Sequence, residues 1–224
     1  MLSSQTVENY LKTIYQAQAA GLSHRDLVPM GQIATALGVV PGTATTMVKA
    51  LAESGLVYYE PYMGVRLSPA GERLASLVLR RHRLVELFLV KVLGMSWAEV
   101  HDEAEQLEHA VSERVIERID EFLGRPSVDP HGDPIPTAEG TIAPSDDLDL
   151  STAPLASPML VTRITNQDPD FLRFIEQHEL MPGKVVVVTS RSENADAVSL
   201  SGSAGAPTTL GTRAARHILV RPQV

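Results

Sequence analysis

The chain has 224 residues, a net charge of −8 and no cysteine. The lack of cysteine excludes disulfides, thiolate zinc sites and cysteine-ligated iron–sulfur clusters. No apolar run reaches the roughly 18 residues of a membrane span, and the N-terminus lacks the basic and apolar parts of a signal peptide. We therefore expect a cytoplasmic chain of two or three small domains, with no membrane partner.

Negative charge is concentrated in the middle of the chain. Residues 1–70 carry four basic and four acidic side chains, residues 71–143 carry eight and fourteen, and residues 144–224 carry seven and nine. Phosphate contacts need Lys and Arg, so an acidic surface opposes DNA binding whereas the neutral first third permits it. A divalent cation bound in the middle third would neutralise part of the charge and favour approach to DNA.

The first 70 residues show the element order of a winged helix-turn-helix. Apolar residues at helical spacing predict helices over 6–19, 30–37 and 43–54. Two short β-runs then flank a glycine-containing turn. In this architecture the third helix enters the major groove and the hairpin touches the DNA backbone. The candidate DNA contacts on that helix are Thr43, Thr45, Thr46 and Lys49.

Two long apolar helices are expected in the middle of the chain. The run 68–72 is a strong helix start, with a capping serine, a proline in the first turn and an acid close behind, and the apolar stripe continues to Leu93. The second helix begins near Ala98 and its stripe reaches Phe122. Their apolar surface exceeds the need of one short domain, which predicts a homodimer; a two-fold protein would match a palindromic operator.

These two helices also carry imidazoles and carboxylates at the i, i+4 spacing that places side chains on one face. On the second helix the residues are His101, Glu105, Glu108 and His109. On the first helix the pair is His82 and Glu86. Carboxylates and imidazoles on facing helices are how helical proteins build divalent-metal sites, so we predict a metal site here.

The C-terminal third has the pattern of a linker followed by a small β-domain. Residues 144–157 are rich in Pro, Ser, Asp and Ala without periodicity, which predicts a flexible linker. Several short apolar runs with glycine turns and one helix over 170–178 predict a small β-barrel of about 65 residues. The remaining histidines have no neighbouring ligands and are expected to be solvated: His24, His131, His178 and His217.

Six motifs occur in a specific order along the chain. They occupy residues 8–15, 53–57, 67–71, 81–84, 100–109 and 131–136. Over nearly the whole chain their order and spacing resemble the metal-dependent repressors of the diphtheria toxin repressor and manganese transport regulator family. The resemblance implies a mainly α fold with a small β part. Its domains would be a winged helix-turn-helix over 1–70, a helical metal-binding and dimerisation domain over 71–143, a linker over 144–157 and an SH3-like (FeoA-like) domain over 158–224.

The resemblance also implies two metal sites. The positions that match the first, between the first helix and the dimerisation helices, are Asn9, Glu105, Glu108 and His109. The positions that match the ancillary site are His82, Glu86 and His101, completed in long members by C-terminal polar side chains that match Gln167, Asp168 or Asp170. Iron-responsive members have a cysteine and a methionine where this chain has Glu105 and Asn9. A donor set of oxygen and nitrogen alone favours Mn²⁺ or Fe²⁺.

Together these features predict a homodimeric repressor, activated by Mn²⁺ or Fe²⁺, that binds double-stranded operator DNA of metal-homeostasis genes and is not an enzyme. One alternative is a helical metalloenzyme that uses the same His/Glu cluster, although no nucleophile or phosphate-cradling glycine loop is evident. A second alternative is a metal-independent winged-helix regulator whose acidic face is solvated. Single i, i+4 pairs and threonines at a helix start are also common surface features without any ligand.

Overall fold

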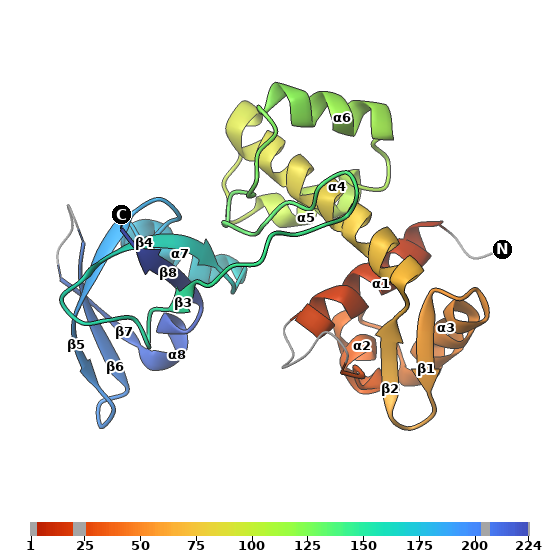
Figure 1. The fold of residues 1–224 in the computed structure, drawn as a ribbon, viewed down its shortest axis with the longest axis horizontal. Helices are drawn as coiled ribbons and strands as arrows, with labels where there is room; N and C mark the ends of the chain where they lie inside the picture. Colours follow the sequence, from red (N-terminus) through yellow and green to blue (C-terminus); the bar gives the residue numbers. More distant parts are fainter. Residues whose placement is uncertain (1–3, 20–25, 203–206, 224) are drawn as a thin grey trace. The chain divides into compact units, whose positions relative to one another are not determined.

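The computed structural model describes residues 4–19, 26–202 and 207–223, so His24 lies outside the described residues. The chain divides into two units, Met1–His82 with Pro136–Ile142 and Arg83–Ile135 with Ala143–Val224. Figure 1 shows the elements along the chain. No helix within the described ranges is long and apolar enough to cross a membrane.

The first unit is a three-helix bundle with a β-hairpin. Its elements are α1 (Ser4–Ala19), α2 (Met30–Ala36), α3 (Pro41–Glu53), β1 (Val57–Glu60), β2 (Gly64–Leu67) and the start of α4 (Pro69–Leu93). The two strands are antiparallel, with Val57 opposite Leu67 and Glu60 opposite Gly64. This order confirms the predicted winged helix-turn-helix.

One apolar face of each helix builds the core of this unit. Leu11 and Ile14 of α1, Ile33 of α2, and Val48 and Leu51 of α3 are all buried. Helix α3 begins earlier than expected because its first turn contains a proline, and a missing N–H costs nothing at that position.

The helical part of the second unit contains the rest of α4, then α5 (Val100–Leu107) and α6 (Glu113–Phe122). The expected single helix from Ala98 to Phe122 is therefore wrong. Extended backbone at Ser112 separates the two helices. The apolar periodicity continues across this break, so the spacing alone could not reveal it.

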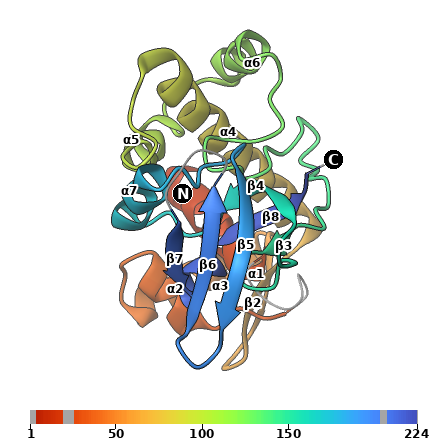
Figure 2. The same cartoon turned by 90° about the vertical axis from the view of Figure 1, so that its left-hand side faces the viewer.

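The rest of the second unit is an antiparallel sheet with two helices. Its elements are β3 (Leu148–Asp149), β4 (Pro158–Ile164), α7 (Pro169–Gln177), β5 (Val185–Ser192), β6 (Ala197–Gly202), β7 (Thr208–Gly211), α8 (Thr212–Ala215) and β8 (Ile218–Pro222). The strand order is β3-β8-β4-β5-β6-β7. Figure 2 shows β5 and β6, the most extensively paired strands, side by side.

Part of the predicted linker over 144–157 belongs to this sheet. Strand β3 pairs with β8, and Leu150 and Ala153 are fully buried in the core of the sheet. The linker prediction is wrong for residues 148–153, because a two-residue edge strand is too short to show the alternation that marks a strand.

A loop over residues 129–133 attaches the helical part of this unit to the sheet. The amide of Ile164 donates to the His131 carbonyl at 2.8 Å, and Gln167 Nε2 donates to Asp133 Oδ2 at 2.8 Å. Gly132 has φ +85°, and a Cβ built on it would lie 2.0 Å from the Thr162 carbonyl oxygen. Only glycine allows the loop to approach β4 this closely.

We expect Gly132→Ala to destabilise the second unit by more than Gly183→Ala. Both glycines have positive φ, but a Cβ at Gly183 would meet nothing within 4 Å. The conformational cost of about 1–2 kcal/mol is common to both variants, and the clash with β4 adds to it only at Gly132. Thermal unfolding followed by the fluorescence of Trp97, the only tryptophan, measures the difference. Equal melting temperatures for the two variants would contradict the close approach.

Candidate metal centre

Imidazole and carboxylate groups gather in three overlapping clusters in the described part of the chain. In each cluster, one ligand atom per residue lies within 4.8 Å of the others. The clusters are His82 with Glu86 and His101, His82 with Glu105 and Glu108, and Glu86 with Asp129 and His131. The first two consist of predicted ligands, whereas the third contains two residues that were not predicted.

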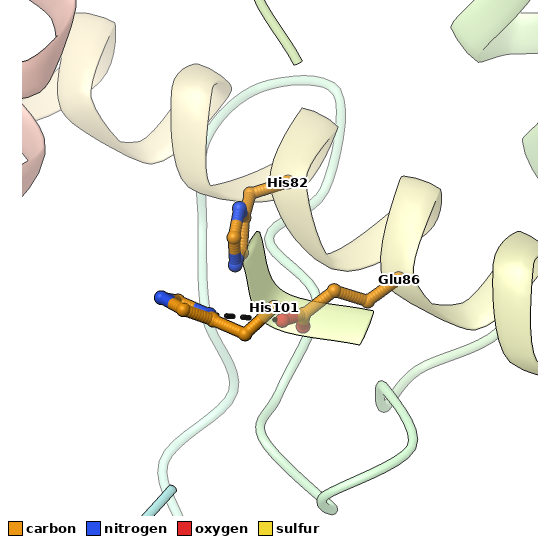
Figure 3. A group of neighbouring side chains, drawn as sticks. All are labelled: His82, Glu86 and His101. Carbon is orange, nitrogen blue, oxygen red and sulfur yellow. Dashed lines mark hydrogen bonds and ion pairs between the residues drawn. The ribbon is translucent and has the colours of Figure 1, made fainter. Parts of the chain in front are cut away.

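The first cluster is formed by α4 and α5. His82 and Glu86 are one turn apart on α4, and His101 lies on α5 with its Nδ1 3.2 Å from Glu86 Oε1. Figure 3 shows the three side chains turned toward one another. His82 and Glu86 are buried, whereas the His101 side chain is 40 % exposed. The cluster is therefore preformed on its buried side and open to solvent at His101.

The predicted ligands of the other site continue along and beyond α5. His101 Nε2 lies 3.7 Å from Glu105 Oε1, so each ring nitrogen of His101 faces a carboxylate. At the end of α5, His109 Nε2 lies 3.3 Å from Glu108 Oε1, and Glu108 is fully buried. Asn9 lies half-buried on α1, in the first unit. Its role as a ligand stays a prediction.

The three C-terminal candidates make other contacts. Gln167 donates to Asp133. Asp168 is the N-cap of α7, and its side chain accepts two backbone N–H bonds. Asp170 is 91 % exposed and pairs with Arg173. Neither aspartate belongs to one of the His/carboxylate clusters among the described residues. The part of all three residues in an ancillary site stays a prediction.

His131 was expected to be solvated, and that expectation is wrong. It is fully buried, its Nε2 lies 2.8 Å from the Trp97 carbonyl oxygen, and its ring stacks on Trp97 with centroids 5.3 Å apart. His178 is exposed and His217 is half-exposed. The burial of His131 depends on Trp97 and on β4, which lie about thirty residues away on either side along the chain.

Asp129 is buried beside His131 in an electrostatically unfavourable setting. Burial raises the pKa of its carboxyl well above the ordinary value of 3.8, and the negative charges of Asp133 and Glu86 raise it further. Arg83 and a backbone hydrogen bond act in the opposite direction without reversing the shift. Burial and the two neighbouring carboxylates therefore favour the neutral form of the Asp129 carboxyl.

The candidate DNA-contact residues lie on α3. Thr43, Thr46 and Lys49 are exposed, and Thr45 is half-buried. The hydroxyls of Thr45 and Thr46 donate to carbonyls one turn earlier in the helix. This leaves their oxygen lone pairs and methyl groups for an external partner. Their contact with DNA stays a prediction.

The hairpin adds a basic group beside this helix. Arg66 of β2 lies over the Tyr58 ring, with its guanidinium carbon 4.2 Å from the ring centroid. At the tip, Tyr62 is fully exposed with φ 66°. The hairpin thus presents a guanidinium held over an aromatic ring and an exposed tip.

Family comparison matches all three parts of the chain. Residues 1–65 match the "Iron dependent repressor, N-terminal DNA binding domain" and residues 68–137 match the "Iron dependent repressor, metal binding and dimerisation domain". Residues 148–222 match the "FeoA domain". The chain belongs to the iron-dependent repressor family. The mainly α fold with a small SH3-like domain is thereby confirmed.

Individual relatives of this family cover most of the chain. The iron-dependent repressor IdeR of Mycobacterium tuberculosis is 32 % identical over 196 residues, which is 82 % of this chain and 83 % of the relative. The diphtheria toxin repressor of Corynebacterium efficiens is 36 % identical over 132 residues, 58 % of this chain and 55 % of the relative. A manganese-dependent transcriptional repressor solved in complex with manganese is 40 % identical with a TM-score of 0.88, covering 97 % of this chain and 100 % of that one.

The iron-dependent repressor family consists of transcriptional repressors rather than enzymes. Membership removes the metalloenzyme alternative, since the His/Glu clusters lie within the domain described as metal-binding and dimerising. It also confirms the predicted class of protein, a metal-dependent DNA-binding repressor.

We expect Asp129→Asn to change how the stability of the metal-free protein depends on pH. A carboxyl whose pKa is raised on folding favours the protonated folded state, so its contribution is present at low pH and is lost as the pH rises through the raised pKa. The asparagine cannot ionise, so the variant should lack this loss. Chemical unfolding in chelator from about pH 4 to pH 8 measures the difference between the two curves.

The matched control is Asp102→Asn, a carboxylate-to-amide change at an exposed position of α5. Its curve should follow that of the unaltered protein. If the free energy of unfolding depended on pH in the same way for Asp129→Asn and for the unaltered protein, burial would not shift the titration of Asp129.

Proposed function

We propose that this protein is a divalent-metal-activated transcriptional repressor that acts in the cytoplasm as a homodimer on operator DNA of metal-homeostasis genes. The observation that carries the proposal is the gathering of five predicted ligands into clusters on α4 and α5, in a chain that begins with a winged helix-turn-helix. Its relatives include repressors described as iron-dependent and manganese-dependent.

The donor set fits Mn²⁺ or Fe²⁺. Imidazole nitrogens and carboxylate oxygens gather at the clusters, and the chain has no cysteine that could favour a softer ion. Glu86 and Glu108 are buried carboxylates, each with an imidazole nitrogen within 3.3 Å. A buried carboxylate is stable only when positive charge or hydrogen bonds balance it. Because every proposed ligand atom is oxygen or nitrogen, we propose Mn²⁺ or Fe²⁺ rather than a softer ion.

Residues on separate elements would hold the ion. We propose Glu105, Glu108 and His109 with Asn9 of α1 at one site, and His82, Glu86 and His101 at the other. A bound divalent cation supplies positive charge that the acidic side chains share. Ligands on separate elements bind well only when both elements are in place, so binding favours one arrangement of the DNA-binding part on the dimer. Ligation also lowers the negative charge that opposes phosphate.

Glu105→Ala or His109→Ala should abolish metal-dependent DNA binding while leaving a folded dimer. In the unaltered protein we expect Mn²⁺ to raise the affinity for DNA by about 5-fold to 150-fold, the usual range of coupling between two sites. Either variant should show nearly the same affinity in Mn²⁺ and in chelator. Gel shifts on the promoter region of the protein's own gene, across Mn²⁺, Fe²⁺, Zn²⁺ and chelator, measure the ratio.

Glu103→Ala is the matched control, because it removes one acidic charge from an exposed position of the same helix. It should keep the metal response. The proposal would be overturned if the unaltered protein bound DNA equally well in chelator and in Mn²⁺.

Lys49→Ala should weaken DNA binding by a similar factor on all DNA sequences. It should also reduce the slope of the logarithm of the affinity against the logarithm of the salt concentration by about one in magnitude. Lys49 is exposed on α3, where a cation would contact a phosphate. Lys91→Ala removes an exposed lysine at the end of α4 and should leave the slope unchanged. The slope is measured from affinities across a series of salt concentrations. An unchanged slope for Lys49→Ala would remove this lysine from the interface.

A further inference from the structure

The turn between α4 and α5 contributes side chains to the core of the C-terminal sheet. Trp97 and Ala98 of this turn are buried in the same apolar core as Met159 of β4 and Val220 of β8. Val90, near the end of α4, packs both against this core and against the core of the helical part. The two cores of the second unit therefore meet at the turn that joins the two helices with the candidate metal ligands.

Trp97 is fixed in this core by its ring and by its backbone. The ring stacks on that of His131, with centroids 5.3 Å apart and planes at 25°. The Trp97 carbonyl oxygen lies 2.8 Å from His131 Nε2, and the carbonyl of His131 accepts the amide of Ile164 in β4 at 2.8 Å. Tryptophan buries a large apolar surface, so its removal from the core is costly. The turn is thus anchored to the sheet both by apolar packing and by a chain of contacts through His131.

Only two residues separate Trp97 from helix α5, which begins at Val100. The amides of Glu99 and Val100 both donate to the Ser96 carbonyl at 3.1 Å, which gives the intervening residues a fixed turn conformation. Val100 is fully buried in the core of the helical part. The place of Trp97 therefore determines where α5 begins.

The first turn of α5 carries an imidazole whose position depends on that start. His101 Nδ1 lies 3.2 Å from Glu86 Oε1 of α4, and His101 Nε2 lies 3.7 Å from Glu105 Oε1. The His101 side chain is 40 % exposed, so packing covers only part of the ring. The distance between His101 and Glu86 therefore depends on where the backbone of α5 starts.

We propose that Trp97 is a positioning residue of the metal cluster. By anchoring the turn in the core of the C-terminal sheet, it holds His101 of α5 opposite Glu86 of α4. The C-terminal part would thus set the affinity for a divalent cation through apolar packing, in addition to any side chain that it offers as a ligand. The inference deepens the proposed function and rests on it, because it takes the cluster to bind metal.

Trp97→Ala should weaken Mn²⁺ binding at this cluster by about 10-fold to 100-fold, the usual effect of losing a group that orients a metal ligand. Trp97→Phe refills part of the core and should weaken Mn²⁺ binding by less. Calorimetric titration of Mn²⁺ into the full-length chain without DNA measures the affinity, and the binding step of the cluster is the one that His101→Ala removes.

The titration separates a failure of the inference from a failure of the proposed function. A His101-dependent step with the same Mn²⁺ affinity in Trp97→Ala and in the unaltered protein would overturn the inference alone. If no step depended on His101, the proposed metal site would fail, and the inference would fail with it.

Phe174→Ala is the matched control. Phe174 is an aromatic residue of α7 that packs against the same core, but it lies in the sheet part of the chain. Its truncation should leave the Mn²⁺ affinity of the cluster unchanged. If Phe174→Ala weakened Mn²⁺ binding as much as Trp97→Ala, the effect would come from the stability of the core, and the inference would be wrong.

Single variants of the three candidate C-terminal ligands separate packing from ligation. Each should weaken Mn²⁺ binding by less than Trp97→Ala, because each leaves the anchor in place. A single variant with the same effect as Trp97→Ala would show that a lost ligand explains the loss, and would overturn the inference. The variants are Gln167→Ala, Asp168→Asn and Asp170→Ala.

A measurement with Trp97 in place covers the case in which Trp97→Ala fails to fold. A protease site inserted between Ser145 and Asp146, in an exposed stretch outside helices and strands, allows the folded chain to be cut there. Gel filtration then compares how tightly residues 146–224 stay bound to the rest of the chain in Mn²⁺ and in chelator. Coupling is reciprocal, so Mn²⁺ should tighten this association. The three ligand substitutions, combined in the cut chain, remove direct ligation as a cause. Equal dissociation in Mn²⁺ and in chelator would overturn the inference.

Discussion

Glu86 is a carboxylate that is about 1 % exposed, so groups inside the protein must balance its negative charge. Removing an ionised carboxylate from water costs several kcal/mol unless a partner of opposite charge is near. His101 lies 3.2 Å from Glu86, and Glu86 belongs to two of the three ligand clusters. The imidazoles around it can each carry a proton or offer a lone pair to a metal. The same atoms therefore form a polar cluster in the absence of metal and are the candidate ligands of an ion.

Helix α4 contains residues of both units. The helix begins in the first unit and ends in the second. At its start, the Ser68 amide and hydroxyl donate to the carbonyls of Leu56 at 3.0 Å and Gly55 at 2.7 Å, which fixes it to the turn between α3 and β1. His82 and Glu86 lie about four and five turns further along the same helix. The turn before the wing and the residues of the candidate metal site are thus connected by one continuous helix in the chain.

Periodic features of the sequence predicted most of the fold and much of the candidate site. The helices of the winged unit and the His82/Glu86 pair follow from side-chain spacing, because i and i+4 residues share a face whatever the tertiary structure. The separation of α5 and α6 could not be predicted, because the apolar stripe runs on through Ser112. The short strands β3 and β7 were missed because two or four residues show too little alternation.

Burial of His131 was missed for a different reason. Nothing in its local sequence shows that Trp97 stacks on it from before α5 and that Ile164 binds its carbonyl from β4. Long-range packing decides whether a histidine is solvated or buried. Similarly, Asp168 lies in a stretch expected to supply an ancillary ligand, but its side chain caps α7. A capping aspartate and a ligand aspartate look alike in a sequence.

The central claim is that cation binding at the helical clusters and DNA binding by the winged unit are one coupled equilibrium. Coupling between two binding events is reciprocal, so each ligand must raise the affinity for the other by the same factor. The most direct test is calorimetric titration of Mn²⁺ into the protein with and without operator DNA. The account predicts that DNA tightens Mn²⁺ binding by the factor by which Mn²⁺ tightens DNA binding. A Mn²⁺ affinity that does not change when DNA is present would contradict it.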